Sequence, residues 1–119
     1  MPMKRNPYES KHMRGVRGSV PSQFDSIKIF DRQGESVTLF VGELEKGVYD
    51  FGYQVTLPDK TNLKKIPGVG SGWFESHHDA NAYAAYAVKL AFGSRLSKPA
   101  LDSITRHISQ IMTPKLDLI

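Results

Sequence analysis

The short turns between its first apolar segments constrain the fold of this 119-residue chain more than any other feature. Three segments between residues 26 and 57 alternate apolar with polar side chains, and only RQGE (32–35) and EKG (45–47) separate them. Alternation with a period of two is typical of strands that bury one face. Turns of this length cannot hold a helical crossover, so consecutive strands pair antiparallel. The sequence predicts strands at 26–31, 36–44 and 48–57.

Two shorter segments continue this pattern. LKKI (63–66) follows PDKTN (58–62), in which Pro, Asp and Asn stand at turn positions, and predicts a fourth strand. GWF (72–74) predicts a fifth extended piece that leads into a helix.

Helix signals replace the strand pattern after residue 75. Ser76 followed by Asp79 fits the acidic form of a capping box, and Gly93 stands where a left-handed C-cap belongs. The segment between them is rich in alanine and predicts a helix that lies close against the sheet. We expect Tyr83, Val88 and Leu90 in the core of the domain, with His78, Asn81 and Lys89 as the exposed stripe.

A second helix is predicted from SKPALDSITRHISQIM. Ser97 is its N-cap, Pro99 lies in its first turn, and Pro114 ends it. Apolar residues recur three and four positions apart at Leu101, Ile104, Ile108, Ile111 and Met112. The fold class is therefore α+β, with an antiparallel sheet of three to five strands packed against two C-terminal helices. The predicted organisation is a flexible basic arm (1–22), a single α+β domain (23–113) and a C-terminal tail (114–119).

The net charge of +4 comes entirely from the first twenty residues. This segment holds five basic residues and one acidic residue, whereas residues 21–119 hold eleven of each. It has no apolar period, so we expect it to stay outside the core. Basic arms bind nucleic acid because each cation set against a phosphate releases condensed counterions. The alternative is a solvated segment with no ligand. The candidate phosphate contacts are Lys4, Arg5, Lys11, Arg14 and Arg17.

Several kinds of chemistry are absent from the sequence. The chain has no cysteine, which excludes disulfides, thiol nucleophiles and cysteine-based metal sites. GVGSG (68–72) does not open directly into a helix, and the adjacent His77 and His78 point about 100° apart on a helix. No nucleophile or metalloprotease motif is present. We therefore expect a non-enzymatic protein without metal or cofactor, and, with no membrane span or signal peptide, a cytoplasmic location.

The stretch that enters the first helix resembles AP2-type and integrase arm-type DNA-binding domains. In those families the last strand ends in a G-x-F motif, and the helix that follows carries A-x-x-A-Y. The likeness covers about 45 residues, including GYQVTL (52–57), and the turn after that strand is longer here than in the families. The matching motif residues are Gly72, Phe74, Ala80, Ala82 and Tyr83. The resemblance implies that the exposed sheet face enters the major groove, with Gln54, Thr56, Lys64 and Lys65 as its polar positions. A solvated sheet face is the alternative.

The last residues, KLDLI, resemble the pentapeptide by which bacterial proteins bind the sliding clamp. Leu116, Asp117 and Leu118 match that motif, whereas Lys115 and Ile119 depart from it. The resemblance implies a partner contact through Leu116, Leu118 and Ile119. The alternative is that these side chains pack on the domain itself or at a dimer contact.

Two classes of function follow from the sequence. The first is a small DNA-associated binding module, of the kind found on mobile elements or in phage, that uses the basic arm for phosphate contact. The second is a protein-interaction or inhibitor domain with no nucleic-acid role. A homodimer is one form that this second class can take.

Overall fold

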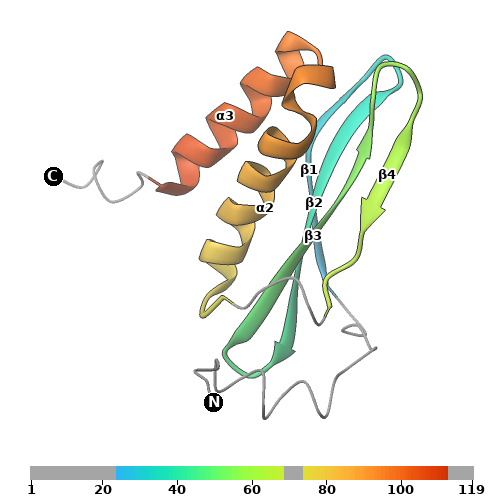
Figure 1. Ribbon diagram of the computed structural model, residues 1–119. Coiled ribbons are helices and arrows are strands. Elements are labelled where there is room, and N and C mark those ends of the chain that lie inside the picture. The colour runs from blue at the N-terminus through green and yellow to red at the C-terminus, as the bar shows by residue number, and fades with distance from the viewer. Residues whose placement is uncertain (1–23, 69–73, 113–119) are drawn as a thin grey trace, which may run out of the picture.

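The computed structural model describes residues 24–68 and 74–112, and shows an α+β fold of two layers (Figure 1). A four-stranded antiparallel sheet with the order β1-β2-β3-β4 forms one layer, and two helices form the other. The predicted fold class is confirmed, with four strands. The elements are β1 (Asp25–Arg32), β2 (Glu35–Glu45), β3 (Val48–Thr56), β4 (Asn62–Lys65), α2 (His77–Phe92), a 3₁₀ turn (Gly93–Arg95) and α3 (Lys98–Met112).

Tight turns connect the strands as the sequence predicts. Gln33 and Gly34 both have positive φ, 57° and 85°, which is the backbone of a two-residue hairpin turn that matches the twist of the strands. Gly47, with φ of 80°, closes the next hairpin, where its amide donates to the Glu43 carboxylate. The strand order in the sheet is therefore the order in the chain.

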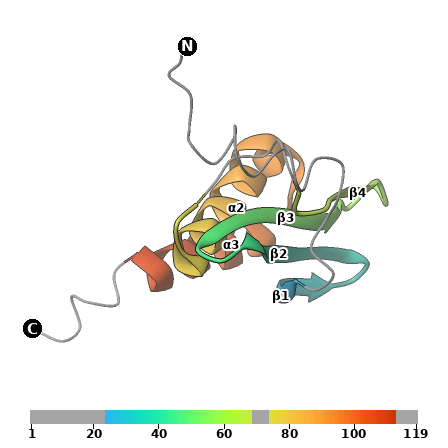
Figure 2. The same cartoon turned by 90° about the horizontal axis from the view of Figure 1, so that it is seen from below.

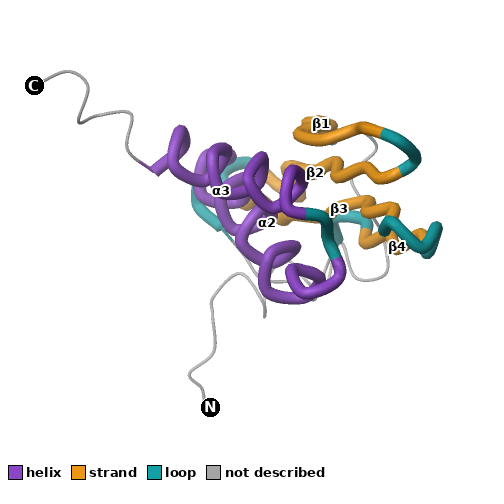
Figure 3. Tube along the Cα trace, turned by 90° about the horizontal axis from the view of Figure 1, so that it is seen from above, coloured by secondary structure: helices purple, strands orange, loops and turns teal. Residues whose placement is uncertain are grey.

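Both helices lie on the same face of the sheet (Figures 2 and 3). α2 packs on β2 and β3, while α3 packs against α2 and β1. Both predicted N-caps are confirmed: Ser76 Oγ accepts from the Asp79 amide at 3.0 Å, and Ser97 Oγ accepts from the Ala100 amide at 3.3 Å. In the described part of the chain, no helix is long and apolar enough to cross a membrane. The core between the layers includes Val37, Leu39, Val41, Val55, Leu57, Ala84, Val88, Ala100 and Ile104.

The orientation of α2 corrects two predictions. Val88 is fully buried as expected, but Tyr83 is 43% exposed and Leu90 is 66% exposed. Alanines at positions 80, 84 and 85 face the sheet with Val88 instead, because small side chains let the helix approach it closely. The predicted left-handed C-cap is also wrong, since Gly93 has right-handed helical angles and continues into the 3₁₀ turn.

Residues 66–68, which we call the crossing segment, follow β4 and pass over β3 on the sheet face that the helices leave open. The Lys65 carbonyl and the Pro67 ring lie directly over Gly52, in the space that a side chain at that position would fill. Phe74 lies at the edge of β3, where its backbone pairs with Tyr49. The rest of the predicted extended piece at 72–74 lies outside the described residues.

One polar contact joins the two helices and makes stability depend on pH. Nε2 of His107 lies 3.0 Å from Oδ1 of Asn81, and burial lowers the pKa of His107 below its ordinary value of 6.5. The unfolded chain therefore takes up a proton at higher pH than the folded chain does. We expect the free energy of unfolding to fall as the pH drops below about 6.5, until the folded-state pKa is passed.

Denaturant unfolding between about pH 8 and pH 5 measures this dependence. His107→Gln keeps a side chain that can reach Asn81 but cannot titrate, so its stability should vary less over this range. Equal pH dependence in the variant and in the original chain would show that other groups cause it.

Candidate functional site

The sheet face opposite the helices carries a row of polar side chains, which we call the open face. Thr38 on β2 pairs with Gln54 on β3, which in turn pairs with Lys64 on β4. Directly paired residues project to the same side of a sheet, and their chain neighbours Leu39 and Val55 are buried under the helices. The open face consists of Lys28, Ser36, Thr38, Gln54, Thr56, Asn62 and Lys64.

Three of the four predicted sheet contacts lie on the open face. Gln54 and Thr56 are half-buried there, and Lys64 is exposed. Lys28 and Thr38 extend the row onto β1 and β2. Counting alternate residues in the first two strands would have identified both, since Lys28 and Thr38 are directly paired.

Lys65 is separated from this row. It pairs with Tyr53, whose ring packs against Phe92 of α2, so it starts on the helix side of the sheet. Its Nζ donates to the Phe51 carbonyl at 2.7 Å and lies 3.9 Å from Oδ2 of Asp50. Burial lowers the pKa of Lys65, and the nearby Asp50 carboxylate opposes that shift. The Lys65 ammonium group thus binds a backbone carbonyl of β3 at a position beyond the end of β4.

Asp50 has a structural partner on the open-face side of β3. Its side chain is fully buried, and Oδ2 accepts a hydrogen bond from the Gly68 amide at 2.7 Å. Pro67 and Gly68 are also buried. The first glycine of GVGSG therefore belongs to the crossing over β3, where its amide contacts a carboxylate of the protein itself.

The N-terminal end of the described chain is attached to the open face. The Phe24 ring packs against Phe40 with ring centroids 4.9 Å apart, and Phe40 projects to the open-face side because it pairs with Gly52. Nζ of Lys64 lies 6.0 Å from the centroid of the same Phe40 ring. The described chain thus begins with a ring that contacts Phe40, the same ring that Lys64 approaches. No local sequence signal predicts the contact between Phe24 and Phe40.

The two lysines of the open face, Lys28 and Lys64, differ in whether they form an ion pair. Lys28 Nζ lies 3.0 Å from Oδ2 of Asp31 on the same strand. Lys64 has no carboxylate within salt-bridge distance in the ranges that the structure describes. Residues 24–68 and 74–112 together hold ten basic and ten acidic residues, so the described part of the chain has no net charge.

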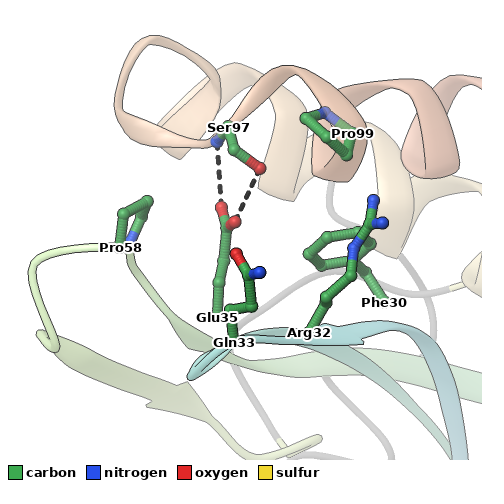
Figure 4. Close-up of a pocket in the computed structure, with 7 residues that line it drawn as sticks. All are labelled: Phe30, Arg32, Gln33, Glu35, Pro58, Ser97 and Pro99. Atoms are coloured by element: carbon green, nitrogen blue, oxygen red, sulfur yellow. Dashed lines mark hydrogen bonds between the residues drawn. The ribbon is translucent and has the colours of Figure 1, made fainter.

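A polar pocket of about 410 Å³ lies between the β1–β2 turn and the start of α3 (Figure 4). The Glu35 carboxylate, which lines it, is only 6% exposed and accepts from both the amide and the hydroxyl of Ser97. The Arg32 guanidinium lies 5.6 Å from the centre of the Phe30 ring. Glu35 therefore holds the first turn of α3 in place, and its oxygens are engaged by that contact.

The histidines of the described chain lie in separate contacts. His77 Nε2 is 2.7 Å from Oδ2 of Asp25, and His107 contacts Asn81. Across residues 24–68 and 74–112, no group of three or more potential ligands among His, Cys, Asp and Glu comes together in a way that could hold a metal ion.

The remaining predicted contacts lie outside the described residues. They are the arm residues Lys4, Arg5, Lys11, Arg14 and Arg17, and the tail residues Leu116, Leu118 and Ile119. Comparison of the chain with protein-family models, with curated proteins and with solved structures finds no match in any of the three.

Proposed function

We propose that this protein is a non-enzymatic nucleic-acid-binding module whose ligand is duplex DNA. The observation that carries the proposal is the contact of Phe24 with Phe40, which sets the start of the described chain against the open face, just after the basic arm (1–22). Phosphate contacts from the segment supply affinity, and polar side chains of the open face position the duplex. Gln54 and Thr56 are the residues suited to contact base edges or the sugar-phosphate backbone, and Lys64 is suited to contact a phosphate.

Salt dependence of binding tests the proposal. Deletion of residues 1–20 should remove most of the affinity for duplex DNA and reduce the slope of log K against log salt concentration by up to about 4 units. Melting temperature should change little, because the deleted segment precedes the first core residues. An unchanged slope after the deletion would contradict a role for the basic segment.

Two matched lysine variants test the role of the open face. Lys64→Ala should weaken binding and reduce the salt slope by about 1 unit, because one phosphate contact is lost. Lys98→Ala is the control, since Lys98 is also an exposed lysine but lies on the helix layer, paired with Asp102 at 3.5 Å. Equal effects of the two variants on binding would place the DNA elsewhere.

A second candidate function is a protein-interaction domain. The observation that favours it is the exposure of Tyr83, Tyr86 and Leu90 along α2, since large exposed apolar patches mark contact surfaces. Deletion of residues 1–20 distinguishes the two functions. A protein-interaction domain keeps its partner after the deletion, whereas a DNA-binding module loses its ligand.

A further inference from the structure

α2 lacks the polar outer face that α3 has. On α3 the exposed positions carry polar or charged side chains such as Asp102, Thr105, Arg106, Ser109 and Gln110. On α2, residues 82–88 contain no charged or amide side chain, and the large apolar side chains Tyr83, Tyr86 and Leu90 are 43%, 47% and 66% exposed, between the exposed polar residues His78 and Asp79 at one end and Lys89 at the other. We call these three residues the α2 stripe. Large exposed apolar side chains gathered on one helix mark a surface that a partner covers.

The α2 stripe borders an apolar hollow of about 450 Å³. Its lining residues are Asp79, Ala82, Tyr83 and Tyr86 of α2, together with Phe74 and with Ile108 of α3. The rings of Phe74 and Tyr83 pack together with centroids 5.3 Å apart, so these two lining residues hold each other in place. A hollow of this kind accepts a large apolar side chain from a partner.

The charges at the two ends of the stripe indicate which partner fits it. Asp79 lies exposed in the first turn of α2, and Lys89 lies exposed in the last turn. Neither side chain has an ion-pair partner within residues 24–68 and 74–112. A parallel arrangement of two α2 helices sets like charges side by side, whereas an antiparallel arrangement sets each carboxylate beside an ammonium group. The stripe is therefore electrostatically complementary to itself in one orientation.

We propose that the protein forms a symmetric dimer in which α2 packs antiparallel on α2 of a second copy. Asp79 and Lys89 are about 15 Å apart along the helix, and a two-fold axis midway between them lies at the level of residue 84, on the exposed side of the helix. This register sets Tyr83 against Tyr86 of the second copy. Leu90 of the second copy then lies over the hollow, and Lys89 of the second copy lies beside Asp79. Each of these contacts occurs twice, as a two-fold interface requires.

Charge reversal provides a test that does not involve nucleic acid. The full chain, freed of nucleic acid, should sediment as a dimer at about 100 µM. Asp79→Lys or Lys89→Asp alone should weaken dimerisation about tenfold or more, because each creates two like-charge contacts per dimer. An equimolar mixture of the two variants should recover the dimer, since only the mixed pair restores both opposite-charge contacts. Leu90→Glu should be monomeric, and circular dichroism should show that each variant keeps its helices.

Three results would overturn this proposal. The first is a chain that stays monomeric at about 100 µM. The second is a dimer whose stability is unaffected by either charge reversal, because the contact would then lie elsewhere. The third is a monomer that dimerises only after deletion of residues 113–119, which would assign the α2 stripe to the chain's own C-terminal segment.

Discussion

Gly52→Ala should lower the free energy of unfolding by about 3 kcal/mol, a large share of the stability of a domain of this size. A β-carbon at this position would overlap the Lys65 carbonyl and approach the Pro67 ring to 2.9 Å. One of these atoms belongs to the backbone and the other to a rigid ring. The crossing segment must therefore lift off the sheet, which strains the hydrogen bond from the Gly68 amide to Asp50.

Gly93→Ala is the matched control for this substitution. Gly93 has right-handed helical angles, and the nearest atom to an added β-carbon is 3.6 Å away, at ordinary contact distance. Alanine should therefore leave stability unchanged or raise it by up to about 1 kcal/mol, because it restricts the unfolded chain. Denaturant unfolding of both variants measures the difference. A small effect of Gly52→Ala would mean that the crossing is loosely held.

Glu35→Ala should destabilise the domain by about 2–4 kcal/mol. The carboxylate is buried and accepts two hydrogen bonds from Ser97, at 2.9 Å from the amide and 2.6 Å from the hydroxyl (Figure 4). Its removal leaves both donors at the first turn of α3 without this acceptor. Glu35→Gln keeps one carbonyl oxygen and should cost less. Thermal or denaturant unfolding gives the free energies.

Glu43→Ala serves as the comparison for the buried glutamate. Glu43 also accepts a hydrogen bond from a backbone amide, that of Gly47 at 3.2 Å, but it is exposed to solvent. Water replaces the lost acceptor there, so the loss should stay below about 1 kcal/mol. If both alanine variants cost the same, the burial of Glu35 does not strengthen its contact with Ser97.

Local signals determined the elements of this protein. The tight turns that the sequence indicates have positive φ at Gln33, Gly34 and Gly47. Each serine cap lies within one turn of the amide that it binds. The period-two alternation predicted strands that bury one face, and the alternate residues Val37, Leu39 and Val41 of β2 are buried. These features involve neighbours along the chain, so a sequence pattern can report them.

Tertiary packing decided which face of α2 is buried. The helix is apolar nearly all round, so its periodicity has no strong direction, and both its alanine face and its tyrosine face satisfy the pattern. Close approach to the sheet selects the alanines and leaves Tyr83 and Leu90 outside. For this reason the sequence did not predict that Tyr83 and Leu90 are exposed.

The sequence also could not predict the contacts that depend on how distant segments pack, including those that shape the open face. Lys64 and Lys65 are neighbours with the same charge, yet the pleat of β4 directs only Lys64 to the open face. Lys65 instead donates a hydrogen bond to the Phe51 carbonyl of β3. The bond of Glu35 to Ser97 joins residues 62 positions apart. The sequence by itself determined which residues form strands, turns and caps, because those depend on near neighbours. Only the tertiary structure decided which polar groups pair inside and which remain for a ligand, because that depends on how the two layers and the crossing segment pack.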